Sequence, residues 1–392
     1  MNIKFLNLGS QPLANKYPPF TKNKQKKYSL NICFNTKSKV ISISKKMKSE
    51  DMFNEKYPYR SSMSQTMKKS FKKLSTEIIK RFNPKLTLEI GSNDGALITN
   101  FKKKKVIGVE PCSNLAKITR NKGFKTYDNY WNLALAKKLK SKHGSIDLIY
   151  SANTITHISN LNVVFKSIDF LLNKNGVLII EDPSLLECIK NNAYDQFYNE
   201  HIYIFSALSL SNILKKNNMK IFDIQKLKTH GGSLRYFIKK NKNKTIKISN
   251  RVHKQILSES KFGLNKLSTY KKFALNVKKS KNQLIKLIKK IKKQNKIIIG
   301  YGATAKAVTV LNYCKIDNKL INFFLDTTPE KQNKLLPGTN IKIFRYDKKL
   351  LSNIKFIFLG AWNFKKEIFK KEKNFIKRGG KFLTHVPIPK IL

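Results

Sequence analysis

The stretch LTLEIGSNDG, residues 86–95, decides the fold of the first half of the chain. It reads as a short apolar strand, a turn bracketed by Gly91 and Gly95, and the start of a helix. Three more apolar runs follow, separated by helical segments: KKVIGVE (104–110), IDLIYSA (146–152) and GVLIIED (176–182). This alternation predicts βαβ units, so we expect an α/β fold with a doubly wound, parallel sheet.

A second α/β unit begins at KIIIGYGATAKA, residues 296–307, and strand patterns recur after it in LINFFLD and KFIFLGAW. Between the two units, apolar residues recur every three or four positions among many lysines, which predicts amphipathic connecting helices. The first residues are polar, with a strand pair expected near YSLNICF and KVISIS. We therefore expect four parts: an N-terminal lobe (1–48), an α/β domain (49–250), a helical connector (251–293) and a C-terminal Rossmann-like domain (294–392).

The formal net charge of +57 would by itself suggest a nucleic-acid or anionic-membrane partner. Only seven of the 80 basic residues are arginine, and the lysines are spread along the whole chain. Because arginine is the usual residue for bidentate phosphate recognition, this pattern favours compositional drift and no nucleic-acid partner. The four cysteines form no CxxC pair and no run is long enough to span a membrane, so we expect a cytoplasmic protein.

The first glycine-rich turn has the features of a nucleoside site. Gly91 and Gly95 allow close backbone approach, while Asn93 and Asp94 can hydrogen-bond across the turn. Glu110 ends the next strand, where an acid can accept hydrogen bonds from two ribose hydroxyls. The turn lacks the third glycine of a pyrophosphate cradle, so S-adenosylmethionine fits better than NAD; an ordinary strand–helix turn is the structural alternative.

Tyr198, Glu200 and His201 bring a phenol, a carboxylate and an imidazole within four residues, after the strand GVLIIED. Removing a proton next to a ketone requires a base with a pKa near neutral and a donor to the developing enolate oxygen. These residue types provide both, and His157 follows a neighbouring strand. The alternative interpretation is a helix start with an exposed acid and imidazole.

These motifs together resemble the sugar C-methyltransferases of deoxysugar biosynthesis. The resemblance extends from LGSQPLAN to VPIP and includes EIGSNDG, VIGVEP, IDLIYSANTITHI, YPYRSSMS, THGGSLRYF and GYGATAKA. It implies catalytic roles for His201 as the base, Tyr198 as a donor, Glu200, His157 and Tyr59. It places the cofactor on Glu89, Gly91, Ser92, Asn93, Asp94, Gly95, Glu110 and Asn153. It places the substrate on Ser61, Ser62, Gly231, Gly232, Arg235, Gly300, Gly302, Lys306, Asp326, Trp362 and Asn363.

The chain departs from the family pattern in two places. FYNEHIYIFS is similar to the family's Y-H-E-H-x-x-Y-F-S signature, with Asn199 and Ile204 at two of its positions. Family members also open with two CxxC pairs that bind zinc, whereas here the second pair corresponds to Asn35 and Ser38. Neither side chain supplies a thiolate, so we expect an N-terminal lobe without metal.

The loop GYGATA carries Gly300, Gly302 and Ala305 at dinucleotide-binding spacing, and Asp326 ends the next strand. Taken alone, this pattern predicts an NAD-dependent oxidoreductase, which is the alternative function. The resemblance instead implies a domain that holds the nucleotide end of a sugar substrate, with an anion site at a helix N-terminus. A third alternative is a non-catalytic, lysine-rich binding protein.

The sequence thus predicts an S-adenosylmethionine-dependent C-methyltransferase. Its expected substrate is a nucleotide-linked keto-deoxysugar, carrying dTDP or CDP, methylated on a carbon next to the ketone through an enolate. We expect a role in surface polysaccharide or other deoxysugar biosynthesis, and a monomer or weak homo-oligomer.

Overall fold

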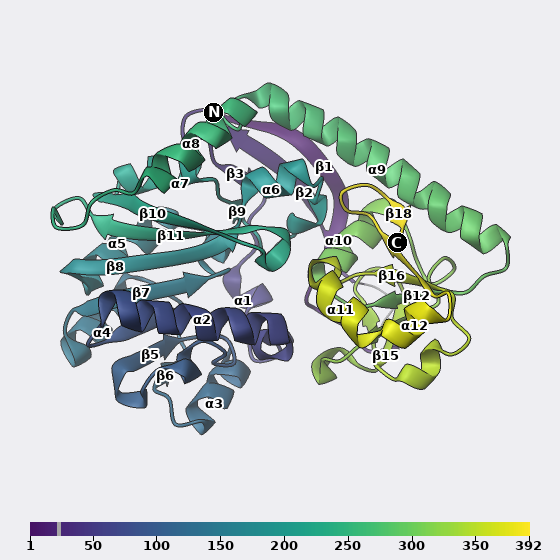
Figure 1. The fold of residues 1–392 in the computed structure, drawn as a ribbon, viewed down its shortest axis with the longest axis horizontal. Coiled ribbons are helices and arrows are strands. Elements are labelled where there is room, and N and C mark those ends of the chain that lie inside the picture. The colour runs from purple at the N-terminus through teal and green to yellow at the C-terminus, as the bar shows by residue number, and fades with distance from the viewer. Residues whose placement is uncertain (22–24) are drawn as a thin grey trace.

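The computed structural model describes residues 1–21 and 25–392. Its strands form three sheets, which belong to an N-terminal lobe, a central domain and a C-terminal domain (Figure 1). In Figure 1 the central and C-terminal domains lie side by side, and the first strands of the chain extend from one to the other.

The central domain is built on a seven-stranded sheet with the order β10-β11-β8-β7-β4-β5-β6. Five of its strands run parallel, and β11 and β10 join the β8 edge antiparallel, which corrects the expectation of a purely parallel sheet. The strand order reverses between β4 and β7, so their carboxyl ends frame the crevice where doubly wound sheets bind ligands. The strands are β4 (Thr87–Ile90), β5 (Val106–Val109), β6 (Thr126–Tyr127), β7 (Ile146–Ala152), β8 (Leu172–Pro183), β10 (Met219–Leu227) and β11 (Ser233–Lys240).

Helix α2 (Gln65–Phe82) covers one face of this sheet with its buried apolar residues. Ser64 caps its first turn by accepting from the backbone N–H of Met67. Its buried apolar residues pack with strand residues such as Tyr150 and Phe237. Residues of α4 (Leu133–His143), α5 (Leu161–Leu171), α7 (Ala207–Lys215) and α8 (Asn250–Phe262) pack in a second core cluster of this domain. The domain also contains α3 (Ser113–Asn121) and α6 (Leu185–Lys190).

The C-terminal domain repeats the architecture with the sheet order β14-β15-β13-β12-β16-β17-β18. The reversal here lies between β12 and β16, so the GYGATA loop after β12 is at the equivalent crevice. The elements are β12 (Ile298–Tyr301), α10 (Ala305–Cys314), β13 (Phe323–Asp326), β14 (Lys334–Leu336), β15 (Ile341–Arg345), β16 (Phe356–Leu359), α11 (Lys365–Lys371), α12 (Lys373–Lys377), β17 (Lys381–Thr384) and β18 (Lys390–Ile391).

Helix α9 (Leu267–Lys293) joins the two α/β domains and runs along the upper edge of Figure 1. Its buried residues, among them Phe273, Val277 and Leu284, recur at helical spacing and pack in the cluster that contains residues of β1 and α10. Only α9 acts as a connector. Helix α8, expected in the connector, packs against β10 and α7 because Val252 joins the apolar core of the central domain.

The N-terminal lobe consists of β1 (Asn2–Pro12), β2 (Lys27–Asn35) and β3 (Ile41–Ile43), with the short helix α1 (Ser49–Met52) following it. The expected pair β2–β3 is antiparallel, and the sheet is completed by β9 (Tyr203–Ile204) from the central domain. The turn after β2 is closed by the Asn35 side chain, which accepts from the backbone N–H groups of Lys37 and Ser38. An amide therefore organises the turn where relatives are expected to place a cysteine pair.

Within the described ranges, no helix combines the length and apolar character needed to cross a membrane.

Candidate active site

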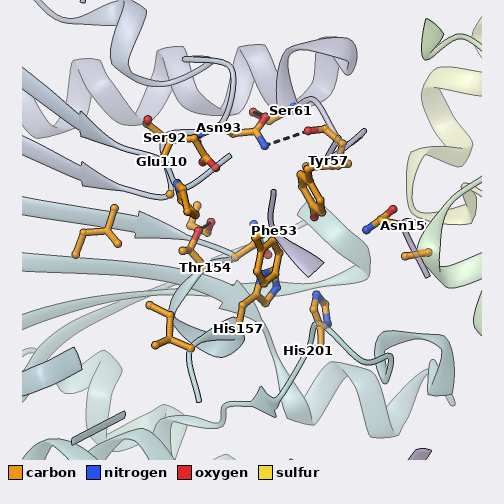
Figure 2. A pocket seen from close by; sticks show the side chains of 18 of the residues that line it. Asn15, Phe53, Tyr57, Ser61, Ser92, Asn93, Glu110, Thr154, His157 and His201 are labelled. Carbon is orange, nitrogen blue, oxygen red and sulfur yellow. Dashed lines mark hydrogen bonds between the residues drawn. The ribbon is translucent and has the colours of Figure 1, made fainter. Parts of the chain in front are cut away.

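A cavity of about 360 Å³ lies at the carboxyl ends of β4, β5 and β7 and extends to the C-terminal domain (Figure 2). Its size is that of a small-molecule site. Residues of all three parts of the molecule line it: Asn15 from the N-terminal lobe, the central strands, and Lys306 and Lys331 from the C-terminal domain. The site is therefore assembled by the tertiary fold and not by one domain.

The turn after β4 forms one end of this cavity. Gly91 has a φ of 77°, and a Cβ there would overlap the side chain of Thr154 in the β7 loop. Asn93 also adopts positive φ, and its backbone N–H donates to the carboxylate of Glu110 at 2.8 Å. Gly91, Ser92, Asn93 and Asn153, all predicted to bind the cofactor, line the cavity together. Glycine at position 91 is what lets the β4 and β7 loops approach each other.

Two buried carboxyl groups, Glu89 and Glu110, face this end of the cavity. Burial raises the pKa of both, and the charge of Glu110 raises the pKa of Glu89 further. Glu110 accepts from the N–H groups of Asn93 and Cys112, whereas Glu89 Oε2 has no hydrogen-bond partner among the described residues. An acidic wall with an unused acceptor suits a cationic ligand with hydroxyl groups.

Asp94 and Gly95, expected in the cofactor pocket, lie behind its wall. Asp94 is fully buried and accepts from the hydroxyls of Ser61 and Ser62, and a Cβ at Gly95 would meet the Thr119 side chain. Ser61 lines the cavity, but Ser62 does not. These residues hold the β4 turn against the loop at residues 59–62, so in this structure they support the wall instead of forming it.

The catalytic candidates Tyr198 and His201 both line the cavity and contact each other. The His201 Nδ1–H donates to the backbone carbonyl of Gln196 at 2.7 Å, which leaves Nε2 to accept from the Tyr198 hydroxyl at 2.5 Å. Burial, with the neighbouring His157 and Lys306, holds the pKa of His201 well below its ordinary value. The imidazole is therefore neutral, with its basic nitrogen directed at the phenol.

His157 stands in the same wall, between two aromatic rings. It stacks on Phe53 with ring centroids 5.4 Å apart and on His201 with centroids 5.0 Å apart (Figure 2). Burial lowers the pKa of His157 to about 3, and its Nε2 has no partner within the described part of the chain. The position agrees with the predicted polar wall, with a ring that stays neutral.

The other two catalytic candidates occupy different positions. Tyr59 lines the cavity and is 37% exposed. Glu200 lies behind the wall, where it accepts from Asn15 and from the Tyr57 hydroxyl, both of which do line the cavity. Burial raises the pKa of Glu200 to about 7. Glu200 is thus a buried carboxylate that acts on the cavity through its neighbours.

Lys306 and Asn363 are the substrate-binding candidates that the C-terminal domain places in the wall. Lys306 is 8% exposed and donates to the Gln196 side chain at 3.0 Å, and burial lowers its pKa. Lys331, which was not predicted from the sequence, lines the same end, donates to the backbone carbonyl of Ala303 and lies 3.7 Å from the Asp326 carboxylate. This end of the cavity therefore carries two buried lysine side chains, one of which is paired with a carboxylate.

The THGGSLR motif lies outside the wall, apart from its histidine, His230. Gly231 is covered by the Trp362 ring, and Gly232 packs against Glu187, so both glycines serve domain packing. Arg235 was predicted to bind the substrate, but it does not line the cavity. It points to the α2 face of the sheet and forms a buried ion pair with Glu181 at 2.9 Å. Trp362 itself donates to Asp195 and is also absent from the wall.

The GYGATA loop is packed against the chain's own residues. A Cβ at Gly300 would overlap Phe324, and one at Gly302 would overlap Ala361. Asp326, the expected ribose acceptor of a dinucleotide site, accepts from the backbone N–H groups of Ala303 and Thr328 at 2.7 and 2.8 Å. Gly300, Gly302 and Asp326 do not line the cavity, and this engaged carboxylate disfavours the NAD alternative.

Many wall residues were not predicted from the sequence, among them Asn15, Phe53, Tyr57, Met67, Phe71, Trp131, Thr154, His230, Thr304, Lys331 and Phe364. Asn15 ends the LGSQPLAN segment and Tyr57 begins YPYRSSMS, so both residues lie in motifs that the sequence revealed. The motifs did not show which residue these two side chains contact. Their partner Glu200 lies 185 and 143 residues away, respectively.

Comparisons with known proteins agree with this geometry. Residues 59–223 match the family described as "Methyltransferase domain", and residues 228–387 match "C-methyltransferase C-terminal domain". The C-methyltransferase NovU of Streptomyces niveus is 29% identical over 309 residues, which are 78% of this chain and 73% of the relative.

Solved structures similar to the chain include two methyltransferases. An S-adenosylmethionine-dependent methyltransferase from Clostridium acetobutylicum is 16% identical, covers 44% of this chain and 91% of its own, and has a TM-score of 0.34. Magnesium protoporphyrin IX methyltransferase from Synechocystis is 14% identical, covers 44% and 82%, and has a TM-score of 0.34.

The doubly wound central sheet, the acidic wall at its switch point and the matched domain define an S-adenosylmethionine-dependent methyltransferase. The matched C-terminal domain and the relative narrow this class. Over both matched domains the chain is similar to C-methyltransferases, and it is an S-adenosylmethionine-dependent C-methyltransferase.

Proposed function

We propose that this C-methyltransferase acts on a nucleotide-linked keto-deoxysugar, at a carbon next to the ketone. The observation that carries the proposal is the division of charge along the cavity. Glu89 and Glu110 line one end, and the buried ammonium groups of Lys306 and Lys331 line the other. The acidic end suits the cationic cofactor, and the basic end suits an anionic substrate such as a sugar diphosphate.

The cofactor-binding residues are proposed from the same geometry. Glu110 would accept from the ribose hydroxyls, and Glu89 has the free acceptor atom that a hydroxyl or ammonium group requires. Gly91, Ser92, Asn93 and Asn153 would contact the rest of the ligand. S-adenosylmethionine supplies the electrophilic methyl group.

The proposed base is His201, as the resemblance implied. Its neutral imidazole can accept a proton at Nε2, because Nδ1–H is held by the Gln196 carbonyl. The Tyr198 hydroxyl, now donated to that nitrogen, would turn to the developing enolate oxygen when the substrate is bound. A carbon nucleophile requires both functions, because a carbon next to a ketone reacts only after it has lost a proton.

The test is turnover with a dTDP- or CDP-linked 4-keto-6-deoxysugar, with S-adenosylmethionine and without NAD. We expect a product heavier by one methylene, with the new methyl group on a carbon next to the ketone in its NMR spectrum. In deuterated water, the hydrogen on that carbon should exchange in wild-type protein. A methyl group found on oxygen, or turnover that requires NAD, would contradict the proposal.

Further support for an assembled substrate site comes from Gly231. Because the Trp362 ring fills the space of its missing side chain, the loop before β11 is fixed against the C-terminal domain. His230, in the same loop, lines the cavity. The two domains are thus packed together at the cavity's edge, as a substrate that touches both would require.

A further inference from the structure

Asn15, in the segment after β1, makes an unusual pair of hydrogen bonds across the molecule. Its Nδ2 donates to both carboxylate oxygens of Glu200, at 2.8 and 2.9 Å. These two bonds fix the orientation of the Asn15 amide. If the amide were flipped, its carbonyl oxygen would face the carboxylate oxygens, and neither group could donate a hydrogen bond. Asn15 lines the cavity (Figure 2). Glu200 is 2% exposed and is not among the lining residues.

The N-terminal lobe holds the whole segment around Glu200. Asn199, which replaces a histidine of the family signature, donates to the Pro12 carbonyl at 3.2 Å. The Ile202 carbonyl accepts from Ile43, and the following strand β9 pairs with β3. Contacts from the lobe thus reach residues 199, 200, 202 and both residues of β9.

The titratable and charged groups that face Glu200 come from four other segments as well as its own. Burial raises the Glu200 pKa, and the donors on Asn15 and Tyr57, with the charge of Lys331, oppose that rise. In turn, burial and then the Glu200 charge raise the pKa of Tyr198. The complete set is Tyr17, Tyr57, Cys112, Tyr198 and Lys331.

We propose that Asn15 is a positioning residue of the methyl-transfer reaction: with the Tyr57 hydroxyl it holds the Glu200 carboxylate in place behind the cavity wall, and so makes the N-terminal lobe part of the active site. Burial already raises the pKa of the Tyr198 phenol, and the negative charge of Glu200 raises that pKa further, so the phenol stays able to donate. The inference rests on the proposed function in that Tyr198 serves there as the hydrogen-bond donor. It adds a residue and a lobe to that machinery.

The first experiment measures the protonation of Glu200 directly and requires no substrate. The infrared C=O band of protonated Glu200 is identified as the band missing in Glu200→Gln, and is then titrated. Asn15→Leu removes the donor at similar volume, and Asn15→Ala serves where leucine does not fit. We expect the Glu200 pKa to rise by about half a unit or more in either variant, because a lost donor disfavours the charged form.

Asn7→Leu is the matched control, because Asn7 is exposed on β1 of the same lobe and its side chain, among the described residues, accepts only from the backbone N–H of Gly9. It should leave the titration unchanged. An unchanged Glu200 pKa in both folded Asn15 variants overturns the inference. So does a shift of equal size in Asn7→Leu.

The second experiment follows the reaction. In Asn15→Leu, the acidic limb of kcat/KM should move to higher pH together with the infrared titration. Adding Asn15→Leu to Glu200→Gln should cost less than twofold further activity, because the amide acts through that carboxylate. A full, additive loss in the double variant contradicts the inference. Wild-type protein that methylates no nucleotide-linked ketosugar refutes the proposed function instead, and Asn15 is then judged by the infrared titration.

Discussion

At the scale of single residues, the cavity contains groups whose charge is set by burial. His201 and His157 are held neutral, because burial lowers the pKa of both. Burial raises the pKa of the Glu200 carboxyl to about 7. A neutral histidine is the form that can accept a proton. The buried wall therefore keeps the proposed base in its active form across the physiological range.

His201→Ala should lower kcat by about a hundred- to ten-thousand-fold, the usual loss when a general base is removed. S-adenosylmethionine affinity should stay within about twofold, because His201 belongs to the wall opposite Glu110 in the proposed arrangement. Steady-state kinetics and calorimetry measure the two effects. His253→Ala, at an exposed position of α8, is the matched control. Full activity in His201→Ala would remove His201 as the base.

Glu200 should also make stability depend on pH. Its pKa is about 7 in the folded chain and near 4.5 when unfolded, so only the unfolded chain loses the proton between these values. The free energy of unfolding of wild-type protein, relative to Glu200→Gln, should therefore fall by about 3 kcal/mol as pH rises from about 4 to about 8. Denaturant unfolding at several pH values measures this difference. A difference that stays constant, or grows with pH, would show that Glu200 does not titrate as described.

At the scale of elements, the decisive contact is between the turn after β4 and the loop after β7. Gly91 has no room for a side chain, because Thr154 fills the space. Positive φ adds a second reason for glycine. The two loops that meet here also carry Ser92, Asn93 and Asn153 into the wall.

Gly91→Ala should lower S-adenosylmethionine affinity by more than about tenfold, because Thr154 must move and both loops with it. Gly144→Ala is the matched control. Gly144 has a similar φ of 74° at the end of α4, but no neighbour within 4 Å of its Cβ position. It should cost only backbone strain, on the order of 1 to 3 kcal/mol of stability because its ψ of −165° lies outside the left-handed helical region, with unchanged affinity. Calorimetry on both folded variants decides, and equal affinities would contradict this role of the turn.

At the scale of the whole molecule, the site exists only where three parts meet. The central domain supplies the acids and the Tyr198–His201 pair, the C-terminal domain supplies two lysines, and the N-terminal lobe supplies Asn15. This division predicts separate effects on cofactor and substrate.

Lys306→Met should raise the KM for the nucleotide-linked substrate by about ten- to a hundred-fold, the value of one charge-assisted hydrogen bond. The dissociation constant of S-adenosylmethionine should not change. Lys366→Met, at an exposed position of α11, is the matched control, and neither constant should move there. An unchanged substrate KM in Lys306→Met would show that the anion is bound elsewhere.

The sequence by itself determined both α/β domains and predicted several residues at one end of the cavity. Apolar strand runs, helical spacing and the glycine turn at residues 91–95 are local signals, and each acts within a few residues of itself. The sequence also predicted the wall residues that directly follow β4, β5 and β7. The carboxyl ends of parallel strands lie at one edge of a sheet, so residues after these strands come together.

Only the tertiary structure decided which side chains share the cavity and what each does there. Asn15 meets Glu200 across 185 residues, and strand direction turns Arg235 toward α2 and away from the wall. The GYGATA loop satisfies a dinucleotide pattern, yet its Asp326 is engaged by the chain's own backbone. Such contacts depend on how separate elements pack, and no local spacing encodes the distance between residues far apart in the chain.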